Sequence, residues 1–406
     1  MQNSSSPRSN HLFPAKRQAA LERLAEFEKT ASRYSRMRNH VLPDHSNVSR
    51  LSPAIRHRLI SEEETARYIL HRYAFSTVEK FLQEVYWRRY WKDWLELRPQ
   101  TWRDYCQELS SLEISPQATQ AMSGEGPVAV MNHFAHELVE TGYLHNHARM
   151  WFAAYWIHTL HLPWQIGADF FYRHLLDADP ASNTLSWRWV AGLQTLGKSY
   201  LARKSNIEKY LHPDLLATHS QGLELLENPQ AQKFENSVRY SAVKKEKQPT
   251  ANLFQSEHRT GFWIHEEDLS PPLPQEGVPV LITLDSPRWQ KRGYSKAKQS
   301  WLREALTDTA SRYSESTLVE GDAIQSLHHW ALQNQLSQVV TMRPYVGELK
   351  DQLESGDLNK LNITFLDRPE DLVTHAKAKA GFFGFWKSLE KEIRALKEDH
   401  PDPELF

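Results

Sequence analysis

The chain has 406 residues, of which 40% are hydrophobic and 24% charged, a composition typical of a globular protein with room for two domains. Its net charge of −1 argues against a strongly basic nucleic-acid-binding protein, and no apolar run is long enough to predict a membrane span. The single cysteine, Cys106, excludes an internal disulfide and a cysteine metal cluster. We expect a cytoplasmic protein in which Cys106 is a small buried hydrophobic residue.

The first residues are polar and rich in serine and lack the apolar core of a secretory signal, so residues 1–14 are predicted to be a disordered tail. Residues 15–229 then place apolar side chains three and four positions apart, which predicts an all-helical domain. Most of the 14 tryptophans fall in this part. A large aromatic core and a stacked planar cofactor both explain such a density, and composition does not separate them.

Residues 230–258 are polar and include the run Lys244–Lys247, which predicts a linker. Residues 259–400 follow a different period, in which short apolar runs alternate with amphipathic helical stretches, and residues 401–406 are predicted to be a tail. This pattern predicts a doubly wound parallel sheet with helices on both faces. The apolar runs lie at 261–265, 278–284, 317–320, 338–342 and 362–366. No Gly-x-Gly-x-x-Gly follows the first run, so this part offers no direct case for a dinucleotide site.

The helical part contains the most specific motif. It reads Gly-Tyr-Leu-His-Asn-His-Ala-Arg-Met at 142–150, then Trp164, then Asp-Ala-Asp-Pro-Ala-Ser-Asn-Thr-Leu-Ser-Trp-Arg-Trp at 177–189. Upstream stand Ser-Arg-Leu-Ser-Pro at 49–53 and Glu-Val-Tyr-Trp-Arg at 84–88. This ordered set resembles the FAD domain of DNA photolyases and cryptochromes. The resemblance covers residues 34–210.

The resemblance implies a noncovalently bound FAD. A serine turn that opens a helix offers hydroxyl and N–H groups to the pyrophosphate, although Ser49 and Ser52 are also typical helix caps. Arg149 is expected to pair with Asp177 or Asp179, although an exposed acidic loop also explains these two aspartates. Asn183 is expected to face the flavin N5, although it is also a typical cap or turn residue. The implied cofactor-binding residues are Tyr34, Ser49, Leu51, Ser52, Arg88, Asn146, Arg149, Asp177, Asp179 and Asn183.

The same resemblance implies an electron-transfer chain of tryptophans. Trp187 and Trp164 match its proximal and middle members, although two core tryptophans explain them as well. No tryptophan stands at 111–116, where the distal member is expected, and the nearest candidate, Trp102, is out of register. Either another aromatic residue such as Trp102 completes the route, or photoreduction is weak.

Five further residues match the catalytic set of cyclobutane pyrimidine dimer photolyases, which implies UV-damaged DNA as partner and a flipped dimer stacked in a cavity. They are Glu84, Asn146, Met150, Trp87 and Trp189. Taken singly, Glu84 is a common helix-surface carboxylate and Met150 a common core residue.

Two departures weaken the implied repair activity. His147 stands where an Arg usually grips the DNA, and Asn47-Val48 replaces the usual Gly-Thr. Arg88, Arg89 and Lys92 follow Trp87 and are candidates for phosphate contacts, unless they form a solvated helix face.

The α/β part resembles the photolyase segment that ordinarily comes first in the chain, on residues 262–269, 278–287, 320–322 and 382–387. The whole therefore resembles a circularly permuted photolyase, which surface termini make physically tolerable. In the family this domain holds an antenna chromophore, a folate or a deazaflavin, or is empty, and the sequence does not distinguish these cases. The leading hypothesis is a monomeric, light-driven repair enzyme. The alternatives are a cryptochrome-like photoreceptor without repair activity and a flavoprotein that keeps FAD for stability alone.

Overall fold

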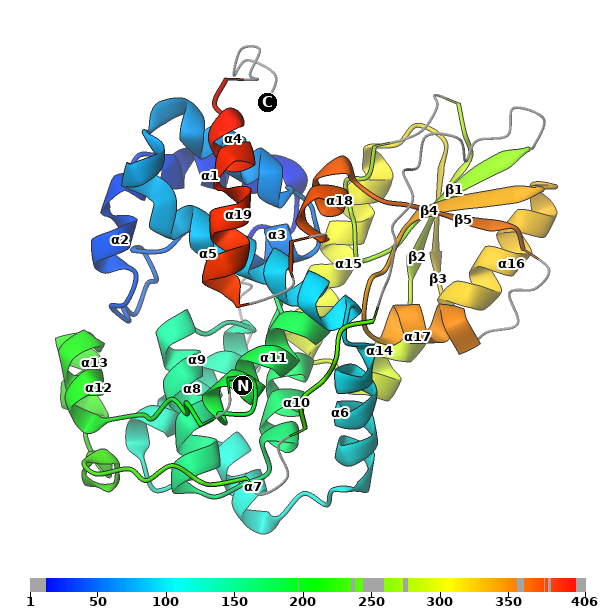
Figure 1. Ribbon diagram of the computed structural model, residues 1–406. Coiled ribbons are helices and arrows are strands. Elements are labelled where there is room, and N and C mark those ends of the chain that lie inside the picture. Colours follow the sequence, from blue (N-terminus) through cyan, green and yellow to red (C-terminus); the bar gives the residue numbers. More distant parts are fainter. Residues whose placement is uncertain are drawn as a thin grey trace, which may run out of the picture. The chain divides into compact units, whose positions relative to one another are not determined.

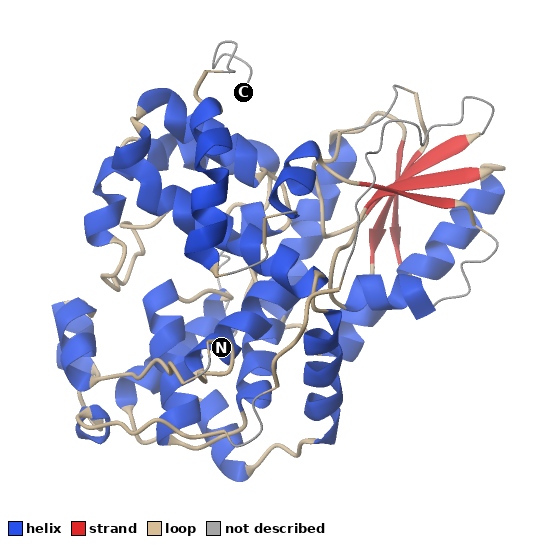
Figure 2. Cartoon of the chain, viewed as in Figure 1, coloured by secondary structure: helices blue, strands red, loops and turns tan. Residues whose placement is uncertain are grey.

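The computed structural model describes residues 12–195, 197–234, 238–243, 259–272, 277–355, 361–375, 377–378 and 381–398. Every regular element described before residue 227 is a helix, and from residue 260 the chain contains both strands and helices (Figure 2). This order agrees with the predicted fold class. The predicted tail 401–406 and most of the predicted tail 1–14 and linker 230–258 lie outside the described residues. Phe13, at the end of the first predicted tail, is described and is fully buried.

The chain divides into two compact units, and each is described by itself. Unit 1 comprises Met1–Ser32, Ser49–Trp94 and Lys244–Phe406, and unit 2 comprises Arg33–Val48 and Leu95–Val243. Unit 1 therefore combines the first helices of the chain with the whole sheet. The predicted domain bounds lie where the hydrophobic period changes, near residue 230. The period indicates where helices give way to strands, but it does not indicate which helices pack on the sheet.

Unit 1 contains a five-stranded parallel sheet in the order β3-β2-β1-β4-β5. Its strands are β1 Thr260–Ile264, β2 Val280–Leu284, β3 Ser316–Glu320, β4 Gln338–Met342 and β5 Ile363–Leu366. Each begins and ends within two residues of a predicted apolar run. The strands β2 and β4, which flank the central strand β1, are buried along their whole length, as expected for strands covered on both faces.

Helices cover both faces of this sheet, which confirms the predicted doubly wound arrangement. Figure 1 shows α15 and α16 on opposite sides of the strands. Trp263, Leu281 and Val339 pack with α16 and α17 in one hydrophobic cluster. Because successive side chains of a strand face opposite ways, Phe262 and Ile282 face the other side. The helices of unit 1 are α1 Arg17–Glu28, α3 Ser52–Arg56, α4 Glu62–Arg72, α5 Phe75–Glu96 as far as Trp94, α14 Ser286–Arg292, α15 Lys296–Ser311, α16 Ala323–Gln333, α17 Glu348–Ser355, α18 Pro369–His375 and α19 Phe382–Ala395.

Buried ion pairs join the first helices of unit 1 to its α/β part. Asp371 accepts two hydrogen bonds from Arg58, at 2.6 and 2.8 Å, and one from Arg89 at 2.8 Å. The Tyr345 hydroxyl donates a fourth at 3.0 Å. All four side chains are buried, so the pairing is largely shielded from solvent. These contacts bridge up to 313 residues of sequence.

Unit 2 is helical and has an aromatic core in which Trp151, Phe152 and Trp156 are fully buried. Gly142 ends α8 in the left-handed conformation (φ 71°), where an added Cβ would lie 2.7 Å from the Leu176 side chain. Its elements are the end of a 3-10 helix at Ala31–Arg33, α2 Tyr34–Met37, α6 Pro99–Ser111, α7 Pro116–Met122, α8 Ala129–Thr141, α9 Asn146–Ala154, a π-helix at Tyr155–Thr159, α10 Trp164–His174, α11 Pro180–Val190, α12 Lys204–Tyr210, α13 Pro213–Thr218 and a 3-10 helix at Leu223–Leu226.

Cys106 contradicts the prediction of a buried thiol, because it is exposed on α6. The buried face of α6 is formed by Thr101, Trp102 and Tyr105. Cys106 directly follows Tyr105, and one residue turns an α-helix by about 100°, which carries the thiol off that face.

Among the described residues, none of the helices has the length and apolar character that crossing a bilayer demands.

Candidate functional site

A partly buried pair of opposite charges in unit 2 joins two residues of the predicted cofactor set. The Arg149 guanidinium donates to both carboxylate oxygens of Asp177, at 2.9 and 3.0 Å, and its Nε donates to the Leu144 carbonyl at 2.8 Å. The guanidinium also lies 5.2 Å from the centre of the Tyr143 ring. This bidentate geometry confirms the predicted pairing. Asp177 is buried, so the exposed acidic loop is wrong for this residue.

Asp179 has a second role that the sequence did not reveal, because it is the N-cap of α11. Its Oδ1 accepts hydrogen bonds from the backbone N–H groups of Ala181 and Ser182, both at 2.9 Å. The side chain is fully buried, so it is not part of an exposed loop either. The cap fixes where α11 begins and therefore where Asn183 and Trp187 lie along it.

Asn183 lies inside α11 and not at a cap or turn. Its Nδ2 donates to the Ala168 carbonyl of α10 at 2.8 Å. Trp187, one turn later on α11, packs against α10 at Gly167, where an added Cβ would lie 2.4 Å from the indole ring. Gly167 is therefore required by the position of Trp187. A lone glycine in a helix gives no sequence signal for such a role.

The substrate-side residues of unit 2 lie on α9 and α11. Asn146 is exposed, and its Nδ2 is 4.0 Å from Met150 Sδ one turn later. Trp189 is half-buried and stacks on Tyr200 with ring centroids 5.8 Å apart. The geometry thus brings Asn146 and Met150 together.

His147, at the position of the expected arginine, is not a substitute cation. Its ring stacks on Trp151 with centroids 4.4 Å apart, and its Nδ1 lies 2.8 Å from the Asn39 carbonyl oxygen. Burial lowers the pKa of His147 below its ordinary value, so the imidazole is neutral at neutral pH. A neutral ring cannot replace the charge of an arginine at a DNA phosphate.

The serine turn belongs to unit 1 and opens the short helix α3. Leu51 is the N-cap, and no side chain caps the helix, so capping is the wrong explanation for Ser52. Ser49 Oγ accepts a hydrogen bond from the Leu51 N–H at 3.3 Å. Ser52 Oγ is buried and has no hydrogen-bond partner within the described residues. A buried hydroxyl of this kind fits a polar group supplied by a ligand, such as a phosphate oxygen. Tyr34 is partly buried on α2 of unit 2.

Glu84, Trp87 and Arg88 are partly buried on α5 of unit 1. Glu84 and Arg88 lie one helical turn apart and share a face. Trp87 stacks on Phe382 of α19, with ring centroids 3.7 Å apart and planes 10° from parallel. One face of the predicted stacking wall is therefore covered by the chain's own phenyl ring. Phe382 had no assigned role in the sequence beyond its place in a closing helix.

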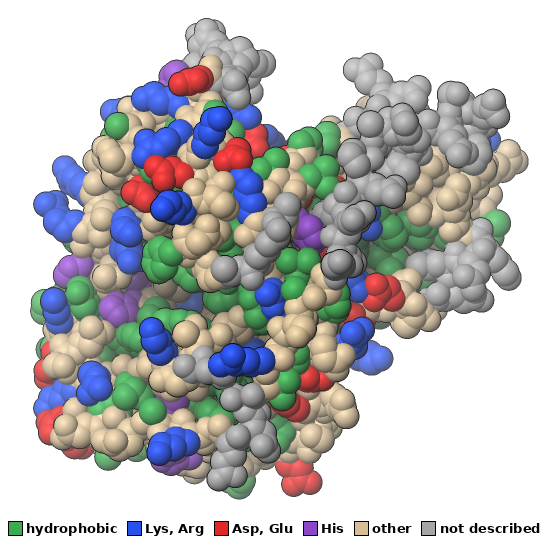
Figure 3. Space-filling model, in the orientation of Figure 1, with side chains coloured by type: hydrophobic (Ala, Val, Ile, Leu, Met, Phe, Trp, Pro, Cys, Tyr) green, Lys and Arg blue, Asp and Glu red, His purple; other side chains and the backbone are tan. Residues whose placement is uncertain are grey.

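Arg89 and Lys92 are not available for DNA phosphates, which corrects the interpretation of this stretch. Both side chains are buried in unit 1. Arg89 pairs with Asp93 and Asp371, and Lys92 Nζ lies 3.8 Å from Glu267 Oε2. On the face drawn in Figure 3, acidic and basic side chains are intermixed over α4 and α19, in keeping with a net charge near zero.

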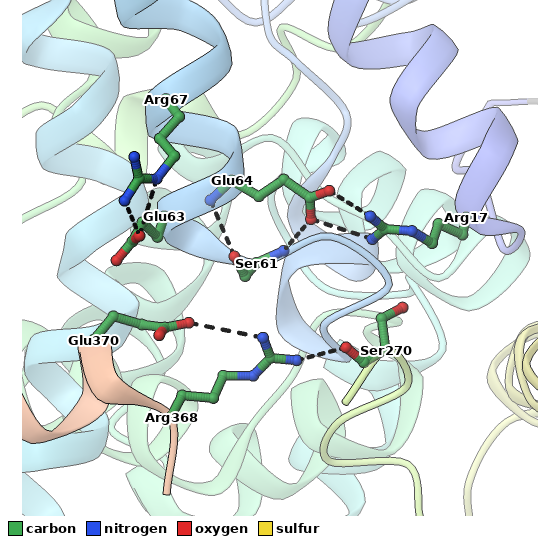
Figure 4. Close-up of a pocket in the computed structure, with 8 residues that line it drawn as sticks. All are labelled: Arg17, Ser61, Glu63, Glu64, Arg67, Ser270, Arg368 and Glu370. Carbon is green, nitrogen blue, oxygen red and sulfur yellow. Dashed lines mark hydrogen bonds and ion pairs between the residues drawn. The ribbon is translucent and has the colours of Figure 1, made fainter. Parts of the chain in front are cut away.

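A separate pocket of about 310 Å³ lies within unit 1 (Figure 4). It is lined by Arg17, Ser61, Glu63, Glu64, Arg67, Ser270, Arg368 and Glu370, none of which is a predicted site residue. Its three arginines are paired with Glu64, Glu63 and Asp268. The paired charges leave this pocket without a dedicated anion site.

The carboxyl edge of the sheet, where open α/β sheets usually bind ligands, is filled by ion pairs. Asp268, after β1, accepts two hydrogen bonds of 2.8 Å from Arg368, and Arg58 NH1 donates to it at 3.4 Å. After β4, Arg343 binds Asp367, which also accepts from the Tyr345 hydroxyl at 2.7 Å. A planar antenna chromophore would have to displace these groups, so the described residues at this edge do not fit one.

Comparison with known proteins identifies the segment that carries the site. Residues 81–212 match the family model described as the FAD binding domain of DNA photolyase. In this segment, the chain is similar to DNA photolyases. The photolyase segment runs from α5 to the end of α12 and contains Glu84, Arg149, Asp177, Asn183 and Trp187, whereas the serine turn precedes it.

Curated photolyases and cryptochromes match part of the chain. The deoxyribodipyrimidine photo-lyase of Alkalihalophilus pseudofirmus is 30% identical over 183 residues, which is 43% of this chain and 38% of that protein. A cryptochrome DASH of Idiomarina loihiensis is 34% identical over 87 residues, 21% of this chain and 19% of that protein. Among solved structures, a class III photolyase of Agrobacterium tumefaciens gives a TM-score of 0.42 at 25% identity, over 48% of this chain and 42% of that one. The chain spans less than half the length of these relatives.

Proposed function

We propose that this chain binds FAD noncovalently and uses it for light-driven repair of cyclobutane pyrimidine dimers in DNA. The observation that carries the proposal is the partly buried bidentate pair of Arg149 and Asp177 within the segment that matches the photolyase FAD binding domain. Bound FAD supplies light absorption and the transferable electron, and the protein orients it and sets the surrounding charge.

The chain's own residues have distinct tasks in this proposal. Arg149 and Asp177 hold a fixed, partly buried charge pair beside the flavin ring. Asn183 is anchored through its Nδ2 to the Ala168 carbonyl, which leaves its amide oxygen to accept from a reduced flavin N5–H. The Ser52 hydroxyl, buried without a described partner, is assigned to the pyrophosphate.

Repair additionally assigns substrate contacts to Glu84, Asn146, Met150, Trp87 and Trp189. Trp87 has one ring face covered by Phe382, so it offers only the other face to a flipped base. Glu84 is proposed to hydrogen-bond the dimer and stabilise the negative charge that develops after electron transfer.

A cryptochrome-like photoreceptor without repair activity is the second candidate function, and a specific observation favours it. His147 is neutral where a DNA-gripping arginine is expected, and Arg89 and Lys92 are committed to buried ion pairs. Three cationic contacts to a DNA backbone are therefore missing, and each phosphate contact contributes to affinity.

The order of the segments supports a circularly permuted photolyase, because the photolyase FAD-binding segment precedes the doubly wound sheet. At the carboxyl edge of that sheet we propose no second chromophore, since partly buried ion pairs hold the position.

The decisive experiment measures flavin content and light-dependent repair of the full chain. Acid precipitation should release the flavin from the protein, and thymine dimers should disappear in light and persist in the dark. Asp177→Ala should lower the FAD content, whereas Asp214→Ala, which removes an exposed aspartate of unit 2, should not. Full flavin occupancy in Asp177→Ala would refute the site, and photoreduction without repair would select the photoreceptor.

A further inference from the structure

A row of aromatic rings in unit 2 continues from Trp164 to the surface helix α6. The Trp164 and Tyr105 rings have centroids 5.5 Å apart and planes 28° from parallel. The Tyr105 and Trp102 centroids are also 5.5 Å apart. All three side chains are buried, so the row runs through the protein interior.

The other end of the row lies at the start of α10, the helix against which Trp187 packs. Gly167 lies three residues after Trp164 on this helix, and its missing side chain leaves the space that the Trp187 ring fills. Trp156 meets Trp187 edge to face at 6.4 Å and donates from its Nε1 to the carbonyl of Pro163, the neighbour of Trp164. Trp187 therefore packs on the first turn of α10, the helix that begins with Trp164.

Tyr105 accounts for the distance in sequence between Trp102 and the position expected for the distal tryptophan, 111–116. Residues 112–115, between α6 and α7, include no aromatic residue, so the expected distal tryptophan has no counterpart there. Trp102 and Tyr105 are three residues apart on α6 and share one helix face. Because the Tyr105 ring lies between Trp164 and Trp102, the row ends at Trp102, one helical turn before Tyr105 on α6.

We propose that Tyr105 bridges Trp164 to Trp102, and that Trp102 is the terminal electron donor of this chain. The proposal rests on the proposed FAD site, which would place the acceptor beside Trp187. An electron passes from Trp102 across the Tyr105 ring to an oxidised Trp164. The Trp102 radical cation then loses its Nε1 proton to water, and a soluble thiol restores it by giving one hydrogen atom. Tyr105 keeps its phenolic proton, because its ring alone carries the coupling.

A buried cation gives the row a direction. The Arg188 guanidinium lies 5.9 Å from the Trp164 ring centre and 5.2 Å from that of Tyr240. A positive charge this close disfavours a radical cation on Trp164 and so drives the oxidation outward to Trp102.

The first test needs no flavin, and it therefore separates this proposal from the proposed function. A soluble one-electron oxidant is applied to the flavin-free full chain, and oxidised tryptophans are mapped by mass spectrometry. In the wild type the oxidation should collect on Trp102, which protects Trp164 through Tyr105, and Tyr105→Leu should raise the oxidation of Trp164. Trp151, which is equally buried and packs on Phe134 and His147, is the internal control and should remain unmodified. Equal oxidation of Trp164 in wild type and Tyr105→Leu would overturn the bridge.

The second test follows the flavin-loaded protein by transient absorption and electron paramagnetic resonance. Wild type should carry a long-lived tryptophan radical, and Trp102→Phe and Tyr105→Leu should lose most of it. Tyr105→Phe should retain it, because phenylalanine keeps the ring, and Trp151→Phe is the matched control. A tyrosyl radical, or an unchanged radical in Trp102→Phe, would overturn the assignment. If FAD is absent altogether, the proposed function fails while the flavin-free test still decides the bridge.

Discussion

Asp371 is the residue whose loss should cost unit 1 the most stability. Its carboxylate, fully buried, accepts hydrogen bonds from Arg58, Arg89 and Tyr345. Asp371→Asn keeps the volume of the side chain but removes the charge that two buried guanidinium groups share. Removing one partner of a buried ion pair typically costs about 3–5 kcal/mol, because the other charge stays desolvated. We expect a loss in that range.

The assay is urea unfolding of the full chain, combined with hydrogen exchange of peptides from α3, α5 and α18. Tyr345→Phe removes only the hydrogen bonding of one hydroxyl to the Asp371 and Asp367 carboxylates and should cost about 1.5–3 kcal/mol. Glu390→Gln, in the exposed pair with Arg394, is the control and should cost less than about 1 kcal/mol. Because Asp371 ties segments that are far apart in the sequence, exchange should rise in all three helices together. A cost below that of Glu390→Gln, or faster exchange in α18 alone, would refute this account of unit 1.

Three further changes test the packing and the buried titratable groups. Burial lowers the pKa of Lys298 to about 7, so below pH 7 the charged, buried lysine destabilises the folded wild type. This destabilisation decreases as the pH rises from 7 toward 10.5. Lys298→Met should therefore raise the stability at pH 7 by at most about 5 kcal/mol, with no gain near pH 10.5, and a constant gain would contradict the assignment. Burial lowers the pKa of His57 to about 3, so the wild type should lose stability as the pH falls from 6.5 to 3, and His57→Gln should show a shallower acid profile in the same unfolding assay. Gly167→Ala should destabilise unit 2 by about 1–3 kcal/mol, because the added methyl group overpacks the space that the Trp187 ring fills. In a double-mutant cycle, the smaller ring of Trp187→Phe should restore part of this stability. Additive effects of the two substitutions would show that the two side chains do not meet.

The strands and the Arg149–Asp177 pair were predictable because each left a local signal. The strands follow from short apolar runs between helical stretches, and the pair follows from a dense motif that resembles a known family. The composition of unit 1 was not predictable in this way. The pairing of Arg58 and Arg89 with Asp371 joins residues 313 and 282 positions apart, and no local pattern encodes such contacts.

Other residues of the site lacked a signal because their roles depend on a neighbour in space. Arg89 and Lys92 read as a solvated or DNA-facing helix side, and their burial depends on acidic partners elsewhere in the chain. The roles of Phe382 and Tyr105 likewise depend on the rings that they contact, Trp87 and Trp164. Periodicity predicts that such residues are buried but does not predict which ring they meet.

The long-range ion pairs of Asp371 also determine when unit 1 can complete its folding during synthesis. A ribosome adds roughly 5–20 residues per second, so Arg58 emerges some 15–60 seconds before its partner aspartate. During that interval the helices from α1 to α5 lack the sheet that will bury them. Folding by such distant contacts is slow and exposes apolar surface to aggregation. We therefore expect the nascent chain to depend on chaperones until α18 has left the ribosome, a dependence that pulse-labelled synthesis with and without chaperone depletion would measure.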